Sequence, residues 1–194
     1  MYDDLKTNPI THVSSDCVLL SFDDGPRPDI APLILDTLRE FGAHACFFVC
    51  GQLGAQHPQL LCRIVADGHE LGNHTWSHLR LMEAAKSDIR MEIGRTQKLI
   101  EETTGCPARF FRPPHGKIDP RTVKMVQDEF KMSTMLWSLD PSDWTSPGAA
   151  VIHSRVSHAI RGGDIVLLHE REQTVEALPA ILSSFRELNL KITV

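Results

Sequence analysis

The stretch CVLLSFDDGP, residues 17–26, is an apolar run that ends in two adjacent acids and a Gly-Pro break. Its apolar half predicts a short buried strand. Desolvated neighbouring carboxylates repel each other, so a buried strand has no simple reason to end in Asp23 and Asp24. A cation bound to one of them relieves the repulsion and leaves the other as a base. The alternative is a solvated loop with an Asp-Gly turn.

Strand-like and helix-like segments alternate along the chain around this stretch. Short apolar runs predict strands at 17–22, 45–50, 69–73, 108–112, 132–138, 165–169 and 191–194. Helical spacing of apolar residues falls between them, at 30–41, 58–68, 87–103, 119–130, 148–160 and 174–188. Such runs are typical of a parallel sheet covered by helices. We therefore predict an α/β fold built from strand–helix units with right-handed crossovers.

Polar side chains gather where five of these strands end. In chain order the clusters are Asp23-Asp24, His74 to His78, Arg112 to His115, Asp140 to Asp143, and His169-Glu170. Parallel α/β folds carry their chemistry at the carboxyl ends of the strands. A barrel brings all of these ends to one rim, whereas an open doubly wound sheet spreads them along an edge. The clusters therefore favour an incomplete seven-stranded barrel.

Length and composition limit the class of protein. The 194 residues are 42% hydrophobic and 23% charged, which suits one globular domain spanning residues 1–194. A net charge of −5 without a basic run argues against a nucleic-acid partner. No apolar stretch is long enough to span a bilayer, and the N-terminus lacks the features of a signal peptide. Localisation stays open between a cytoplasmic protein and a secreted one whose leader is absent from this sequence.

The five cysteines are an odd number, which argues against a closed disulfide framework. Cys17, Cys46 and Cys50 lie in or beside apolar strands, and Cys62 lies on an apolar helix. We interpret them mostly as small buried hydrophobic residues. This scattered placement also argues against a thiol redox protein.

His74 and His78 are four residues apart. If the segment is helical, both rings lie on one face, one turn apart, and can bind one cation. Two imidazoles and one carboxylate form a ligand set that leaves positions open for water. Asp23 or Asp24 would supply the carboxylate. The alternative is a histidine pair on a solvated helix face.

His169 ends the apolar run of its strand, so we expect it at the same rim. Its near-neutral pKa suits a general acid, although a third metal ligand or a capped strand end are alternatives. Asp140 or Asp143 could fix its tautomer. Arg112, if it lies beside Asp23, would keep that carboxylate ionised and oriented; the alternative is a surface ion pair.

Trp137 and Trp144 are two of the three tryptophans and lie near the predicted rim. They could pack against a sugar ring or belong to the core. With only one Tyr in the chain, an extended aromatic platform is not expected. This favours short oligosaccharides or a few contacted sugar units.

Together these segments resemble a known family. SFDDGP at 21–26, HTWSH at 74–78, RPPHG at 112–116, DPSDW at 140–144 and IVLLH at 165–169 resemble, in order, the five motifs of NodB-type polysaccharide deacetylases, carbohydrate esterase family four. The resemblance covers residues 18 to about 170. It implies a distorted seven-stranded (β/α) barrel of parallel strands, similar to a TIM barrel.

The resemblance also implies roles for single residues. Asp24, His74 and His78 would bind a divalent metal ion, zinc first, with cobalt or nickel as alternatives. The catalytic set would be Asp23 as base, His169 as acid, Arg112 orienting Asp23, and Asp143 tuning His169. Substrate contacts would come from the backbone N–H of His115 and from Trp137 and Leu167 around the acetyl methyl group; Trp144 is added to this set on its place near the rim.

The sequence departs from the family pattern at two positions. Ser21 stands where the first motif usually has Thr, which is a mild change. Glu170 stands where the last motif usually has Asp. Glu keeps the charge but is longer by one methylene, so it could shift His169.

We therefore predict a metal-dependent deacetylase that releases acetate from N-acetylglucosamine-containing glycans such as chitin oligosaccharides or peptidoglycan. We expect a monomer whose partner is the glycan. The alternatives are an esterase acting on O-acetylated xylan, a relative acting on a cyclic amide or a formyl-sugar lipid, and a non-catalytic sugar-binding relative.

Overall fold

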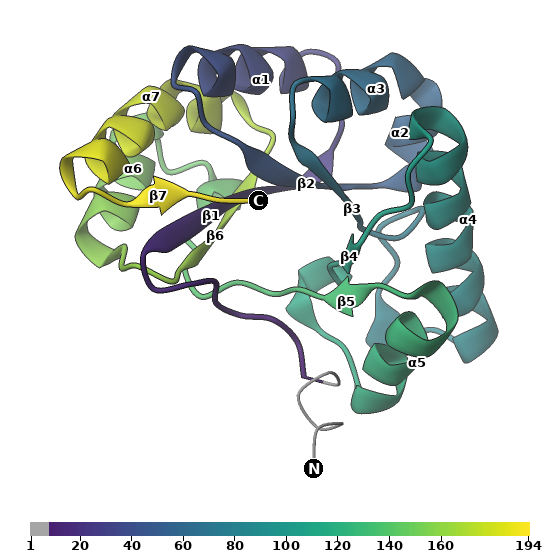
Figure 1. Ribbon diagram of the computed structural model, residues 1–194. Helices are drawn as coiled ribbons and strands as arrows, with labels where there is room; N and C mark the ends of the chain where they lie inside the picture. Colours follow the sequence, from purple (N-terminus) through teal and green to yellow (C-terminus); the bar gives the residue numbers. More distant parts are fainter. Residues whose placement is uncertain (1–7) are drawn as a thin grey trace.

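The computed structural model describes residues 8–194, which form a curled parallel sheet with helices on its outside (Figure 1). The sheet order is β5-β4-β3-β2-β1-β6, and β7 pairs with β1. The strands are β1 (Cys17–Gly25), β2 (Ala45–Val49), β3 (Glu70–Asn73), β4 (Phe110–Phe111), β5 (Ser133–Thr134), β6 (Ile165–His169) and β7 (Lys191–Ile192). All of their pairings are parallel, so the α/β barrel prediction is confirmed.

The helices follow the strands and lie outside the sheet (Figure 1). They are α1 (Ala31–Glu40), α2 (Gly51–Gln56), α3 (Pro58–Ala66), α4 (Lys86–Thr104), α5 (Pro120–Phe130), α6 (Ala149–Ala159) and α7 (Glu172–Glu187). Short 3-10 turns are η1 (Leu81–Glu83), η2 (Pro114–Gly116) and η3 (Asp143–Thr145). The predicted start of α5 is confirmed, because the Asp119 side chain accepts hydrogen bonds from Arg121 N and Thr122 N. The sequence did not lead us to predict helix α2.

The barrel closes through irregular backbone between β5 and β6. The predicted strand 132–138 is regular only over β5. Beyond it, Leu139 N donates to Ile165 O at 3.2 Å and Leu167 N donates to Leu139 O at 2.9 Å. The segment near the N-terminus also joins here, since Leu136 N donates to Ile10 O at 2.8 Å. Isolated β-bridges therefore replace a regular ladder of hydrogen bonds between β5 and β6, which is why the barrel is distorted.

Strand β1 has an outer and an inner face because side chains alternate along a strand. Val18, Leu20 and Phe22 pack outward into the main core with the helices. Leu19 packs inside the barrel in a smaller cluster with Cys46, Phe48, Met135 and Ile165. By the same alternation, Ser21 and Asp23 share the inner face with Leu19. The barrel interior thus becomes polar toward the carboxyl end of β1.

The cysteines divide by position. Cys46 and Cys50 are buried, as predicted, and Cys17 is half-buried. Cys62 is exposed, so the prediction for it is wrong: α3 turns Leu61 and Ile64 inward instead. Burial raises the pKa of the Cys46 and Cys50 thiols, so neither is a reactive thiolate.

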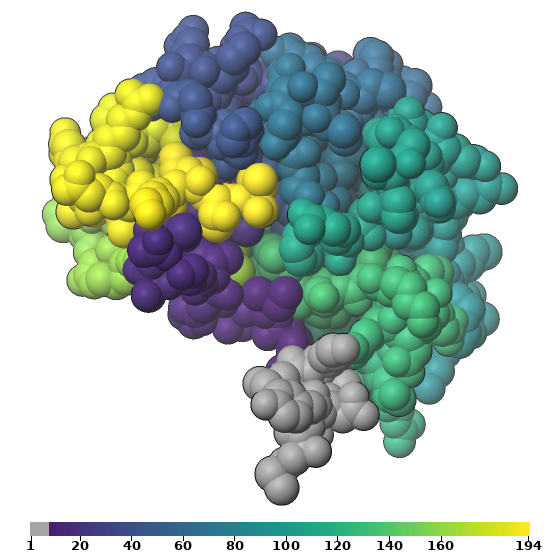
Figure 2. All heavy atoms as spheres, in the orientation of Figure 1, coloured from purple at the N-terminus to yellow at the C-terminus, as the bar shows by residue number. Residues whose placement is uncertain are grey.

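Residues near the two ends of the described chain lie side by side (Figure 2). Lys191 N donates to Asp16 O at 3.3 Å, and Thr193 N donates to Val18 O at 2.9 Å. Across residues 8–194, no helix combines the length and apolar character needed to cross a membrane.

Candidate active site

Strand β1 delivers two adjacent carboxylates to one pocket because it contains a bulge. Its pairing with β2 shifts register between Asp23 and Gly25, and Asp24 has a φ of 69°. In a regular strand, neighbouring side chains point to opposite faces. The extra residue of a bulge redirects the chain, and both Asp23 and Asp24 line the same pocket. The strand also continues to Gly25, beyond the end predicted from the sequence.

His74 and His78 meet through a loop, so the expectation of a shared helix face is wrong. No helix lies between β3 and η1. Thr75 has a φ of 66° and His78 a φ of 61°. These left-handed residues curl the loop until the two imidazole centroids lie 5.0 Å apart. The two rings are therefore neighbours, as predicted, although by a different geometry.

Helices α4 and α2 hold this loop in shape. The Glu92 carboxylate of α4 accepts hydrogen bonds from Trp76 N at 2.9 Å and from Ser77 N at 2.7 Å. The first N–H groups of α2 donate to the carbonyl oxygens of Thr75 and Trp76, both at 2.9 Å. One half-buried acid and one helix start therefore stabilise backbone that would otherwise be strained.

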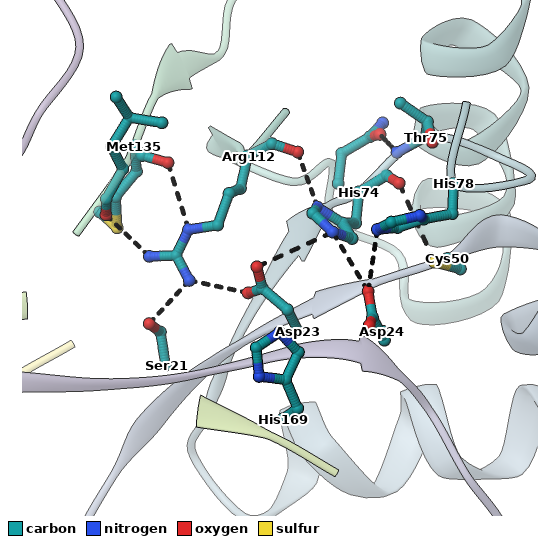
Figure 3. Close-up of polar contacts among 12 residues, drawn as sticks. Ser21, Asp23, Asp24, Cys50, His74, Thr75, His78, Arg112, Met135 and His169 are labelled. Atoms are coloured by element: carbon teal, nitrogen blue, oxygen red, sulfur yellow. Dashed lines mark hydrogen bonds and ion pairs between the residues drawn. The ribbon is translucent and has the colours of Figure 1, made fainter. Parts of the chain in front are cut away.

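The donor atoms of Asp24, His74 and His78 fit a divalent metal ion. Asp24 Oδ1 lies 3.4 Å from His74 Nε2 and 3.2 Å from His78 Nε2 (Figure 3). All three donor atoms lie within 4.8 Å of one another. Asp24 Oδ1 is buried without a partner in hydrogen-bond geometry. Two nitrogens and one oxygen are a ligand set suited to zinc, and they leave positions open.

The tautomer of His74 strengthens this fit. His74 Nδ1 lies 2.7 Å from the backbone carbonyl oxygen of Arg112. A carbonyl oxygen only accepts hydrogen bonds, so Nδ1 carries a proton, and in the neutral ring Nε2 presents a lone pair to Asp24. Two acceptors at this distance repel each other unless a cation lies between them. A backbone carbonyl behind a ligating histidine is also a common support of metal sites.

Arg112 is fully buried behind the pocket and holds Asp23 (Figure 3). Its Nη1 donates to Asp23 Oδ1 at 2.7 Å and to Ser21 Oγ at 2.7 Å. Its other nitrogens donate to the carbonyl oxygens of Met135 and Leu136, at 3.3 and 2.9 Å. The surface ion pair considered as an alternative is therefore wrong. A buried pair with its remaining donors satisfied gives Asp23 a fixed orientation.

His169 stands at the end of β6 and is bound by Asp143. Its Nδ1 lies 2.7 Å from Asp143 Oδ1, and its backbone N donates to Asp143 Oδ2 at 2.8 Å. Thr174 Oγ1 donates to the same carboxylate at 2.6 Å. Burial alone lowers the pKa of His169, but the bond and charge of Asp143, with the charges of Asp23 and Asp24, raise it above its ordinary value. Of the two candidate acids, Asp143 therefore contacts His169, whereas Asp140 binds Ser142 N.

These side chains surround one pocket of about 400 Å³, a size usual for a small-molecule site. It is lined by Asp23, Asp24, His74, His78, His115, Trp137, Asp140, Trp144, Leu167, His169 and Arg171. Of the predicted site residues, only Arg112 and Asp143 are absent from the lining, because both are buried behind it. Trp144 is 53% exposed, which rules out the core position that the sequence left open.

Sequence reasoning missed three contributors to this site. Glu92 sits on a helix whose pattern reads as ordinary amphipathic spacing. Ser21 was noted only as a departure from the family, although its hydroxyl accepts from Arg112 and donates to Val166 O at 2.8 Å. Arg171 lies two residues beyond the last motif, and its charge close to a strand end was the only clue to it.

Glu170 turns away from the pocket and lies buried against β1. Its Oε2 accepts from Arg27 N, while its Oε1 is buried without a partner. Burial raises its pKa to about 8, although the bond and charge of Arg27 oppose that change. A Cβ at Gly25 would clash with Glu170 Oε1. The absence of a side chain at Gly25 therefore makes room for the longer acid, and His169 keeps its bond to Asp143.

The profile of the polysaccharide deacetylase family matches residues 11–130, more than half of the chain. The chain belongs to this family. A peptidoglycan-N-acetylglucosamine deacetylase from Bacillus cereus is 38% identical over 176 residues, covering 88% of this chain and 82% of that protein. A chitooligosaccharide deacetylase from Sinorhizobium fredii is 34% identical over 202 residues, covering 95% and 93% respectively. Membership places the chain among hydrolases of amide carbon–nitrogen bonds outside peptides.

A solved structure of the same family has a closely similar fold. It is a carbohydrate esterase family four pseudoenzyme from Bacillus anthracis, with a TM-score of 0.92 and 30% identity, covering 98% of this chain and 68% of that chain. A mutant of that pseudoenzyme has restored enzymatic activity. Fold similarity alone therefore does not decide turnover, and the residues of the site carry that argument.

Proposed function

We propose that this protein is a metal-dependent deacetylase that hydrolyses N-acetyl groups of N-acetylglucosamine-containing glycans and releases acetate. One observation carries the proposal. An arginine-bound carboxylate, Asp23, and a carboxylate-bound imidazole, His169, line one pocket together with a three-residue metal ligand set. We further propose that one domain spanning residues 1–194 acts as a monomer, because the described part of the chain supplies every one of these groups.

Asp23 is the general base. It takes the proton from the water that attacks the acetamide carbonyl carbon. Arg112 keeps this carboxylate oriented through the bond from Nη1 to Oδ1. The other oxygen, Oδ2, lies 3.8 Å from His74 Nε2, so it is close to one of the three residues that would hold the ion. A general base must lie within hydrogen-bond reach of the group whose proton it takes.

His169 is the general acid. Its Nδ1 is bound to Asp143, so Nε2 carries the proton toward the pocket. An amine is a poor leaving group, and protonation of the sugar nitrogen lets the carbon–nitrogen bond break. The bond and charge of Asp143 raise the pKa of His169, which favours the protonated form that an acid needs. Acetate and a free amino sugar are the products.

Asp24, His74 and His78 would hold the divalent ion, most simply zinc, with cobalt or nickel as alternatives. When bound, the ion supplies Lewis acidity that makes water more acidic and polarises the acetyl carbonyl. His115 has a φ of 59° in the pocket wall, and we assign its backbone N–H to the developing oxyanion. Leu167 and Trp137 would receive the acetyl methyl group, and Trp144 would pack on a sugar ring.

Two rival functions use the same fold. An O-acetyl esterase needs less acid catalysis, because an alcohol leaves more readily than an amine. His169→Ala should therefore reduce amide hydrolysis much more than ester hydrolysis if the amide is the natural bond. A non-catalytic sugar-binding relative would be expected to have lost catalytic groups, whereas each predicted catalytic and metal-ligating residue is present.

The deciding experiment measures acetate release from chitin oligosaccharides, peptidoglycan and acetylated xylan, each with and without a chelator, followed by zinc readdition. We expect release from the amide substrates, loss with chelator and recovery with zinc. Asp23→Asn should abolish turnover while retaining zinc. Activity that survives complete metal removal would overturn the metal-dependent mechanism.

A further inference from the structure

Arg171 is a guanidinium in the pocket wall that this mechanism does not use. It follows β6 and precedes the first residue of α7, so its backbone lies two residues beyond His169. Its Nε is buried without a hydrogen-bond partner. Within residues 8–194, its guanidinium forms no ion pair with an acid. A permanent charge therefore borders the site without a protein counter-ion.

Several other arginines of the chain are paired with an acid. Arg27 binds Asp29 at 3.0 Å, Arg63 binds Asp36 at 2.6 Å, and Arg109 binds Glu70 at 2.6 Å. A buried guanidinium N–H without a partner is costly, because it loses its water without replacement. The charge and planar donor geometry of arginine match a carboxylate best. Arg171 is thus placed where a ligand can supply the missing acceptor.

The other charges in the pocket select where that acceptor would sit. Asp23, Asp24 and Asp140 bring negative charge to the wall. Arg171 is the one lining residue, within the described chain, that is positively charged at every physiological pH. An anionic substituent on the substrate is repelled by Asp140 and attracted by Arg171. The opposite charges of the two residues therefore favour placing the acidic substituent beside Arg171.

We propose that Arg171 binds a carboxylate of the substrate and that the preferred substrate is an N-acetylated glycan with a carboxylate on or beside the reacting sugar. This rests on the proposed function and narrows it. The lactyl ether of muramic acid is such a carboxylate, and an acid on an attached peptide is another source. Neutral chitin oligosaccharides would be accepted as substrates but would leave Arg171 unpaired.

The test compares one glycan in two charge states. Peptide-free peptidoglycan strands carry free lactyl carboxylates, and the same strands with these groups converted to methylamides are neutral. Strands that retain their peptides test the second source, and chitin pentaose is the neutral reference. The readout is kcat/KM for acetate release by wild type, Arg171→Gln and Arg171→Lys.

We expect Arg171→Gln to lower kcat/KM on the carboxylate strands by about 10- to 100-fold, the range for a lost hydrogen bond to a charged group. The loss should lie mainly in KM. It should be less than about twofold on methylamide strands and chitin pentaose, where no such bond exists. Arg171→Lys should recover part of the loss. If Arg171→Gln lowered kcat/KM only on the strands that retain their peptides, the carboxylate bound by Arg171 would belong to the peptide.

Arg39→Gln is the matched control, because it removes the same charge from the exposed face of α1. It should leave all substrates unchanged, and thermal unfolding should confirm that each variant folds. Equal losses of Arg171→Gln on charged and neutral strands, or no loss on either, would overturn the proposal.

A binding experiment separates failure of the proposed function from failure of the proposal for Arg171. If wild type releases no acetate from any glycan, calorimetric binding of the carboxylate and methylamide strands still decides the role of Arg171. Tighter binding of the carboxylate strands by wild type but not by Arg171→Gln would support it. If wild type and Arg171→Gln bind the carboxylate strands equally tightly, the proposal is overturned.

Discussion

His74 Nδ1 donates a hydrogen bond of 2.7 Å to the backbone carbonyl oxygen of Arg112. The side chain of the same arginine binds Asp23 at 2.7 Å. One residue therefore orients a metal ligand through its backbone and the proposed base through its side chain. Substitutions at this position separate the two effects, because they remove the side chain and leave the carbonyl.

Arg112→Met should destabilise the protein and abolish acetate release. The change leaves Asp23 buried without its counter-ion, which costs about 3–5 kcal/mol in comparable buried pairs. Zinc affinity should change much less, because the carbonyl that orients His74 remains. Denaturant unfolding and zinc titration measure the two effects.

The double variant Arg112→Met with Asp23→Asn is the control for this change. It removes the uncompensated charge, so it should recover part of the lost unfolding free energy without recovering activity. If the single variant is as stable as wild type, Arg112 does not compensate Asp23 in the folded state.

Glu92→Ala should weaken metal binding. The Glu92 carboxylate holds two backbone N–H groups between the histidine ligands. Loss of such supporting groups typically costs about 10-fold or more in metal affinity. Zinc competition with a chromophoric chelator measures this, and saturating zinc should restore most of the turnover. Glu101→Ala, on the exposed face of the same helix, should bind zinc like wild type; equal weakening in both variants would remove the role of Glu92.

The sequence predicted elements whose signal is local. The apolar run before Asp23 marked β1, and Asp119 with Pro120 marked the start of α5. Helix α2 escaped because GQLGAQ carries two glycines and no capping side chain. The barrel was inferred from the positions of polar clusters, and the irregular segment that closes it has no periodic pattern.

The candidate site was predictable where it followed strand ends, and less so where partners came from distant elements. His74 and His78 were paired correctly, but their loop depends on Glu92, which follows much later in the chain. No spacing rule connects such residues. The choice between Asp140 and Asp143 as the partner of His169 likewise depends on the turn η3, which buries Asp143 and leaves Asp140 exposed.

Asp143→Asn should move the alkaline limb of the pH profile to lower pH. The bond and charge of Asp143 raise the pKa of His169. Without the charge, His169 loses its proton at lower pH, and the acid form disappears earlier as pH rises. The alkaline limb of kcat/KM reports this group in the free enzyme. Rates on chitin oligosaccharides with saturating zinc across pH measure it.

Asp140→Asn is the control for that profile. It removes the same charge from the pocket wall without touching His169, since Asp140 binds Ser142 N. We expect a much smaller displacement of the alkaline limb. Equal displacements would mean that the general negative field, and not the bond from Asp143, sets the acidity of His169.

Glu170→Gln should make stability less dependent on pH. Burial raises the pKa of Glu170 from 4.5 to about 8 in the folded protein. Between these values the unfolded chain has released the proton and the folded chain retains it. The unfolding free energy of the wild type therefore falls as pH rises through this window, by up to about 1.4 kcal/mol per pH unit from this group. The neutral amide removes that contribution and can still accept the bond from Arg27 N.

Chemical denaturation of both proteins at a series of pH values from 4 to 9 tests this expectation. The stability of the Gln variant relative to wild type should rise through the window and level off above it. Glu172→Gln, which alters the exposed neighbour on α7, should follow wild type at every pH. Parallel curves for wild type and Glu170→Gln would show that Glu170 is already ionised in the folded state, and that its buried oxygen is neutralised by a partner other than a proton.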